Sequence, residues 1–270
     1  MSSSTTGGRP DDRHARLVLG SSFGGAAATY AEHRPDYAQA AARWALEHAP
    51  GSRVLDLGAG TGKLSATLVA LGVDTVAVEP DPGMLAELRR GLPAVHALAG
   101  SAEAIPLPDN SVDAVLSGNA MHWFDMDVAG PEIARVLVPN GILAGLWNVI
   151  DDRVPWVDGL AQASGPAAIG PRDTLSSWRA ATADIHLPSA SLSSPFGSLE
   201  QAEFPHGQRR TAESLVATLT TRAGMLVMPA QEREAALGQI RAFLASRPET
   251  SSGEFTLPML TGVLRPRRQG

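Results

Sequence analysis

The sequence predicts an α/β fold with a mostly parallel seven-stranded sheet, helices on both faces, an antiparallel edge strand and a helical cap. Two observations carry this prediction. Between residues 53 and 150, short continuous apolar segments alternate with segments of helical periodicity. Such alternation is typical of a parallel sheet that helices cover on both faces. Beyond residue 150 the rhythm changes to weak helical signals followed by two further strand-like segments.

The strands of the first half are expected at 53–57, 75–78, 94–99, 112–116 and 142–147. Pro35 can open a first helix that runs to Leu46, because proline suits the first helical turn. The helices between strands follow from apolar spacing, with Leu64, Leu68 and Leu71 in the first of them. Gly72 can end that helix.

The second half predicts short helices at 153–164 and 173–182, a strand at 198–209, helices at 211–222 and 229–246, and a last strand at 255–264. An alternating apolar pattern supports the last strand. Together, these segments complete the sheet with an antiparallel strand and add a cap.

Composition excludes several classes of protein. The 270 residues contain no cysteine, which rules out disulfides, zinc–thiolate sites and a cysteine nucleophile. No run of eighteen apolar residues predicts a membrane span, and the first residues do not resemble a secretory signal, so we expect a cytoplasmic protein. The seven histidines lack paired ligand spacing, so no metal is predicted.

The charge pattern argues against nucleic acid as a partner. The formal net charge is −6, whereas a phosphate backbone favours a basic protein face. The one basic cluster, formed by Arg265, Arg267 and Arg268, is interpreted as a solvated chain end.

A glycine-rich turn follows the first predicted strand. In the segment 56–62, Asp-Leu-Gly-Ala-Gly-Thr-Gly, glycines let a ligand approach the backbone where a helix begins. Glu79 ends the second strand, 21 positions after Gly58, where its carboxylate can accept hydrogen bonds from both ribose hydroxyls. A dinucleotide and an adenosyl ligand both fit this much.

The details favour the adenosyl ligand. A dinucleotide site has a third glycine at the sixth position of its motif, and that position holds Lys63 here. Asp56, directly before the turn, would repel a pyrophosphate but suits a cationic amino-acid ligand.

Five segments in register resemble the class I S-adenosylmethionine-dependent methyltransferases, which have a Rossmann-like fold. The segment 54–62 resembles their first motif, 78–84 their ribose and adenine segment, and 100–108 their adenine loop. The strand at 112–117 and the turn at 140–143 also match. The resemblance spans residues 23–150 and implies S-adenosylmethionine as the cofactor.

The resemblance also implies roles for individual residues. Gly58 and Gly60 would contact the methionine part of the cofactor, Glu79 the ribose, and Met84 the face of adenine. Tyr30 and Arg34 would meet the cofactor's carboxylate, although a surface salt bridge is an equal alternative for Arg34. The remaining cofactor residues it implies are Asp56, Ala59, Pro80, Ser101, Ala102, Glu103 and Asn119.

The segment 119–125, after the fourth strand, resembles a His-Trp signature of a small-molecule subgroup. His122 could act as a general base because its ordinary pKa suits proton removal near neutrality. The alternative is that His122 and Trp123 wall the cofactor and pack under the cap. Trp147 and Trp156 could line the acceptor pocket or serve in packing.

We therefore predict methyl transfer to a small-molecule acceptor by in-line displacement, with no nucleic acid or membrane partner and no oligomeric state indicated. An NAD-dependent oxidoreductase and a cofactor-binding protein without transfer activity are the alternatives. The predicted organisation is a disordered tail (1–22), a cofactor-binding core (23–150), a cap or acceptor-specificity insertion (151–197) and a C-terminal part completing sheet and cap (198–265).

Overall fold

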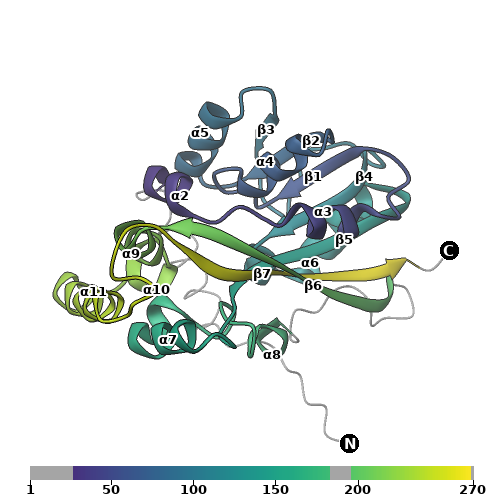
Figure 1. Ribbon diagram of the computed structural model, residues 1–270. Coiled ribbons are helices and arrows are strands. Elements are labelled where there is room, and N and C mark those ends of the chain that lie inside the picture. Colours follow the sequence, from purple (N-terminus) through teal and green to yellow (C-terminus); the bar gives the residue numbers. More distant parts are fainter. Residues whose placement is uncertain (1–26, 183–195, 269–270) are drawn as a thin grey trace, which may run out of the picture.

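One seven-stranded sheet forms the centre of the molecule (Figure 1). The computed structural model describes residues 27–182 and 196–268, so the predicted tail at 1–22 lies outside the described residues. The strand order is β3-β2-β1-β4-β5-β7-β6. The strands are β1 (Arg53–Leu57), β2 (Asp74–Glu79), β3 (His96–Ala99), β4 (Val112–Gly118), β5 (Leu137–Ile150), β6 (Phe196–Arg210) and β7 (Phe255–Arg268).

The direction of the strands confirms the predicted mixed sheet. Strands β1 to β5 pair in parallel, whereas β7 pairs antiparallel with both β5 and β6. The antiparallel strand therefore lies at the predicted edge region, with β6 outermost. The order reverses between β1 and β4, and ligands of open α/β sheets bind in the crevice at such a switch point.

Alternate side chains of the strands enter two different cores, as the pleat of a strand requires. Val54 of β1 packs with Leu64 and Leu68 on one face, whereas Leu55 packs with Ile133 on the other. The first face is covered by α3 (Gln39–Leu46) and α4 (Lys63–Ala70), with α5 (Pro82–Gly91) beside β2 and β3. The second is covered by α6 (Met126–Val136) and α8 (Trp178–Thr182).

A further apolar cluster lies at the Arg210–Phe255 end of the β6–β7 pair, where Figure 1 shows a group of helices beside the sheet. Its helices are α7 (Pro155–Ala168), α9 (Ala212–Thr220), α10 (Ala223–Leu226) and α11 (Ala230–Ala245). Leu257 and Met259 of β7 extend into this cluster and tie it to the sheet. These helices form the body that we call the cap below.

The first helix differs from the prediction. The chain forms α2 (Ala27–His33) and begins α3 only at Gln39, so Pro35 does not open the second helix. Two tertiary contacts hold residues 35–38 extended. The side-chain amide of Asn148 donates to the carbonyls of Pro35 and Asp36, and the Ala38 amide donates to Thr261 Oγ1 at 3.0 Å. These partners come from β5 and β7, beyond the reach of local sequence patterns.

Three tryptophans, Trp147, Trp178 and Trp156, pack against other aromatic side chains. Trp147 and Trp178 stack with ring centroids 6.1 Å apart, and both are fully buried. Gly145 and Gly262 make this possible, since a Cβ at either position would lie within 2.5 Å of one of these rings. Trp156 packs edge-on against Phe255 inside the cap. Trp147 and Trp156 therefore have the packing contacts that the packing alternative predicts.

Arg265 also differs from its interpretation as part of a solvated end. Its side chain is buried, bonds to Glu200 through two nitrogens, and lies over the ring of Trp44 at 4.0 Å. It fastens β7 to β6 and α3. Among the described residues, no helix has the length and apolar character needed to cross a membrane.

Candidate functional site

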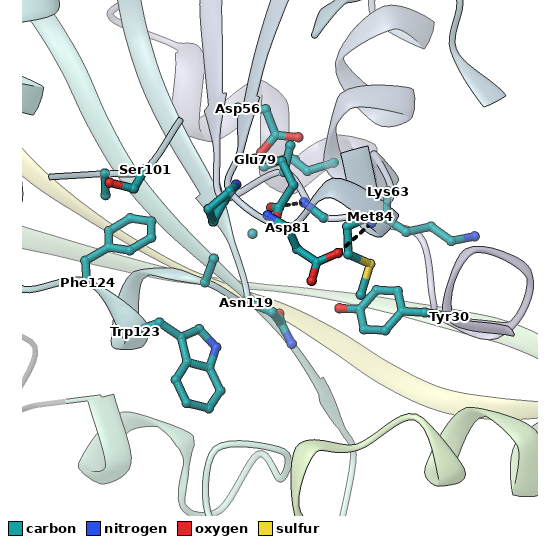
Figure 2. A pocket seen from close by; sticks show the side chains of 18 of the residues that line it. Tyr30, Asp56, Lys63, Glu79, Asp81, Met84, Ser101, Asn119, Trp123 and Phe124 are labelled. Atoms are coloured by element: carbon teal, nitrogen blue, oxygen red, sulfur yellow. Dashed lines mark hydrogen bonds between the residues drawn. The ribbon is translucent and has the colours of Figure 1, made fainter. Parts of the chain in front are cut away.

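A cavity of about 210 Å³ opens at the carboxyl ends of β1, β2 and β4. Loops leave the sheet in different directions at this switch point, which is why side chains from separate segments converge there. Figure 2 shows Phe124 and Trp123 on one side, Met84 and Tyr30 on the other, and Glu79 between them. The cavity is lined by Tyr30, Tyr37, Asp56, Gly58, Ala59, Gly60, Lys63, Leu64, Glu79, Pro80, Asp81, Met84, Ser101, Ala102, Glu103, Gly118, Asn119, Ala120, Trp123 and Phe124.

The glycine turn forms the floor of this cavity. Gly58 and Gly60 have φ of 70° and 57°, in the left-handed region that favours glycine. A Cβ on Gly58 would lie 2.8 Å from the Cβ of Ala120, whereas one on Gly60 would meet nothing within 4 Å. Gly58 is therefore required by close packing as well as by backbone angle, and open space lies beside Gly60 for a ligand.

Glu79 connects the end of β2 to the glycine turn. Its Oε2 accepts a hydrogen bond from the Gly60 amide at 2.8 Å, and its Oε1 accepts one from the Asp81 amide at 2.9 Å. Burial raises the pKa of this carboxyl, and the two amide donors oppose that shift. Each oxygen keeps a further lone pair, so the carboxylate can still accept two hydroxyl hydrogen bonds from the cavity.

Asp56 is fully buried at the end of β1. Its Oδ2 accepts a hydrogen bond from the Ser65 hydroxyl at 2.7 Å, while its Oδ1 has no hydrogen-bond partner among the described residues. Burial raises the pKa of Asp56 to about 7, with Ser65 opposing the shift and the charge of Glu79 adding to it. A cation or hydrogen-bond donor in the cavity would supply what this carboxyl lacks.

Tyr37 and Asn119 form the wall between the cavity and the extended segment after α2. The Tyr37 hydroxyl donates to Asn119 Oδ1 at 3.2 Å, and that oxygen also accepts a hydrogen bond from the backbone amide of Asn148 at 2.8 Å. Asn119 adopts φ of 52°, a conformation in which asparagine is tolerated better than most residues. Burial raises the pKa of Tyr37 well above its ordinary value, so its hydroxyl remains a donor.

Twelve of the fourteen predicted site residues line this one cavity, although they come from five separate segments of the chain. The two that do not are Arg34 and His122. The residues that were not predicted for the site include Tyr37, Lys63 and Asp81. Asp81 could have been found from the local sequence, because an aspartate before Pro82 is a typical N-cap of a helix. Its side chain accepts hydrogen bonds from the Gly83 and Met84 amides at the start of α5, and the residue lines the same cavity.

Arg34 is buried but points elsewhere. Its Nε donates to Thr221 Oγ1 and its Nη2 to the Thr221 carbonyl, both at 3.0 Å, and its guanidinium lies over the Tyr30 ring. The alternative of a surface salt bridge is therefore wrong, because Arg34 is 9% exposed and anchors α2 to the end of α9. It lines a small second cavity, which shares several lining residues, Tyr30 among them, with the first.

His122 lies in a short 3₁₀ turn, Met121–Trp123, behind the cavity wall. Its ring packs against Trp123 with centroids 4.8 Å apart, and it is Trp123 that lines the cavity. The arrangement supports a wall role for this pair more than a proton transfer by His122. Within the described part of the chain, no group of three or more histidine or acidic side chains could hold a metal.

The geometry fits an adenosyl ligand with a cationic amino-acid end. Asp56, whose Oδ1 is unpartnered among the described residues, lines the same cavity as Gly60 and Glu79, so cation-accepting and ribose-accepting groups lie along one opening. Met84 is buried at the edge of this opening and offers an apolar surface, while the Ser101–Glu103 backbone borders it.

Comparison with known proteins points to one family. Residues 55–145 match the model of a methyltransferase domain. An uncharacterized methyltransferase of Mycobacterium tuberculosis is 40% identical over 252 residues, covering 93% of this chain and 97% of its own length. A solved structure assigned to the type II methyltransferases, from Anaeromyxobacter dehalogenans, is 26% identical, covers 87% of this chain and 97% of its own, and has a TM-score of 0.63.

A further match covers only part of the chain. A malonyl-[acyl-carrier protein] O-methyltransferase of Methylococcus capsulatus is 41% identical over 122 residues, which is 41% of this chain and 44% of that enzyme. The relative that matches nearly the full chain has no named acceptor. The relative with a named acceptor matches less than half of the chain. These matches decide against the NAD-dependent alternative.

Proposed function

The chain belongs to the S-adenosylmethionine-dependent methyltransferases, and from that premise we propose that it methylates a small-molecule acceptor by in-line displacement. The observation that carries the proposal is the shape of the site. A single cavity of about 210 Å³ holds the cofactor-fitting groups and the aromatic pair Trp123 and Phe124. A concave, partly apolar pocket is the kind of site that small ligands occupy.

The cofactor's contribution is an electrophilic methyl group on a positively charged sulfur. The residues of this chain would bind the cofactor and orient it toward the acceptor. In the proposed arrangement Glu79 accepts the ribose hydroxyls, Asp56 faces the cationic amino-acid end, and Met84 packs on the adenine. Tyr30 would reach the amino-acid end, and Ser101, Ala102 and Glu103 would border the adenine edge, with Ala59, Pro80 and Asn119 completing the walls.

Alignment and exclusion of water are the main tasks left to the protein, because the methyl donor is already activated. Trp123 and Phe124 would exclude water on the acceptor side. We place the chain in the subgroup with a His-Trp pair after the fourth strand, with His122 holding Trp123 in position rather than moving a proton. The cap and the described part of the predicted insertion, 151–182, would border the acceptor and set its identity, while residues 183–195 of that insertion lie outside the described residues.

The test is a methyl-transfer assay with radiolabelled S-adenosylmethionine against small amines, hydroxyl compounds and acids, alongside RNA and a protein extract. Label transferred to a small molecule, and not to RNA or protein, supports the proposal. Label transferred only to a macromolecule would overturn it. If the protein binds the cofactor but transfers the methyl group to no compound in the set, the result supports the alternative of a cofactor-binding protein without transfer activity.

A further inference from the structure

A small cavity of about 20 Å³ lies directly beside the cofactor-fitting cavity. The two share four lining residues, Tyr30, Tyr37, Lys63 and Asn119. The others that line the small cavity are Arg34, Pro35, Asn148 and Arg222. This volume holds a water molecule or the head of a carboxylate, but no ring.

Three cations meet at this cavity from segments far apart in the chain. Arg34 follows α2, Lys63 begins α4, and Arg222 lies between α9 and α10. Lys63 is the only lysine of the 270 residues. The chain has therefore brought its single lysine and two largely buried arginines to the border of one site.

Nearby carboxylates pair with two of these three cations. Lys63 pairs with Asp36 at 3.3 Å, but the Asp36 side chain is 66% exposed. Arg222 pairs with Asp173 through Nη1 at 2.5 Å. Within residues 27–182 and 196–268, no carboxylate lies within ion-pair distance of Arg34, whose guanidinium bonds only to Thr221.

Arg222 also keeps an unused donor. Its Nε is buried and has no hydrogen-bond partner in the described part of the chain, although its side chain is only 12% exposed. A buried guanidinium donor without a partner is uncommon, because buried polar groups are normally satisfied. Arg222 also lines the small cavity, and a guanidinium pairs well with an oxygen anion such as a carboxylate.

We propose that the small cavity binds an anionic group, in particular a carboxylate, of the acceptor, and that Arg222 is its main contact. The proposal rests on the proposed function and names the acceptor class as small organic acids. Arg34 and Lys63 add positive charge beside the anion, and Tyr30, Tyr37 and Asn119 connect its binding place to the main cavity. The step assigned to these residues is binding and orientation alone.

The same chemistry has a second source, the cofactor's own carboxylate, and the experiment must separate the two. Calorimetric titration is carried out on protein saturated with S-adenosylhomocysteine, with malonate, succinate and fumarate as probes and succinamide as the uncharged control. We expect at least one dicarboxylate to bind and succinamide not to bind. In Arg222→Gln the affinity for that acid falls at least tenfold, while the affinity for S-adenosylhomocysteine changes less than twofold.

Two further variants complete the design. Arg241→Gln removes an exposed arginine that pairs with Glu234, and it leaves acid binding unchanged. The double variant Arg222→Gln/Asp173→Asn avoids leaving a partly buried carboxylate unpaired, and it loses acid binding as the single variant does. Because the double variant leaves no unpaired charge at this position, it covers the case in which the single variant does not fold.

The outcomes are distinct. Absence of dicarboxylate binding to a native protein that binds S-adenosylhomocysteine overturns this inference and leaves the proposed function standing. A tenfold loss of S-adenosylhomocysteine affinity in Arg222→Gln overturns it as well, because the cavity would then serve the cofactor's carboxylate. Failure of the native protein to bind S-adenosylhomocysteine contradicts the proposed function itself.

Discussion

The Oε2 atom of Glu79 accepts a hydrogen bond of 2.8 Å from the backbone amide of Gly60. This bond joins the end of the second strand to the glycine turn that follows the first. It fixes the carboxylate in the cavity and the turn around it at the same time. The charge of the Glu79 carboxylate and its position can therefore be tested by separate substitutions.

Replacing Glu79 with aspartate tests the position. Glu79→Asp keeps the charge but withdraws the carboxylate by one methylene, so it cannot hold the Gly60 and Asp81 amides and reach a ribose together. We expect the affinity for S-adenosylhomocysteine to fall at least tenfold, about 1.4 kcal/mol, in calorimetric titration. The matched change Glu87→Asp, on α5 at an ion pair with Arg90, should leave affinity unchanged. Equal binding by Glu79→Asp and native protein would show that this contact does not position the ligand.

The buried Asp56 predicts how ligand affinity depends on pH. Its pKa is raised to about 7, so the folded protein without ligand keeps Asp56 protonated between pH 3.8 and about 7. A cationic ligand end favours the ionised form, so binding releases a proton below pH 7. Affinity for S-adenosylhomocysteine should rise with pH from 5.5 to about 7 and level off above it. In Asp56→Asn the affinity should change less with pH, and the remaining change should come from Glu79, whose pKa is also raised.

The same pKa gives a stability prediction of the opposite sign. Between pH 3.8 and about 7 the unfolded chain has released this proton and the folded chain has not, so the free energy of unfolding falls as pH rises through this window. Asp56→Asn removes that contribution. Thermal unfolding of the two proteins without ligand, compared at pH 5 and pH 7.5, should show the smaller decrease in the variant. An equal decrease would mean that Asp56 is ionised throughout.

Gly58 should be less replaceable than an ordinary helical glycine. An alanine there must adopt φ of 70°, at a cost of roughly 1–2 kcal/mol, and its Cβ would meet Ala120. Gly238 lies exposed in α11, where a Cβ meets nothing within 4 Å, so Gly238→Ala should stabilise by roughly 0.5–1 kcal/mol. Denaturant unfolding of both variants checks this pair. A Gly58→Ala protein as stable as the native one contradicts the packing account of the turn.

Replacing Trp123 and replacing His122 should have different effects on methyl-transfer activity. Trp123 lines the cavity, whereas His122 contacts the Trp123 ring and is not among the lining residues, so Trp123→Ala should lower methyl transfer far more than His122→Ala. We expect His122→Ala to keep more than a tenth of the native kcat, with an unchanged pH profile. A larger loss together with a flattened pH profile would instead assign proton transfer to His122.

The sequence predicted the parts of the site that are local. The glycine turn follows β1, Glu79 ends β2 and the adenine loop follows β3, and the parallel sheet brings the ends of these strands together without further information. The contacts that it could not predict join distant segments. Arg34 meets Thr221 across 187 positions, and the extended segment before α3 is held by Asn148 and Thr261. No periodicity or motif of either partner indicates such a contact.

The most direct test of the central claim is calorimetric titration of the native protein, Asp56→Ala and Glu79→Ala with S-adenosylhomocysteine at pH 7.5. The account predicts one site per chain in the native protein and markedly weaker binding in both variants, with circular dichroism showing all three folded. A folded native protein that does not bind, or variants that bind as tightly as the native chain, would contradict the assignment of this cavity to the cofactor.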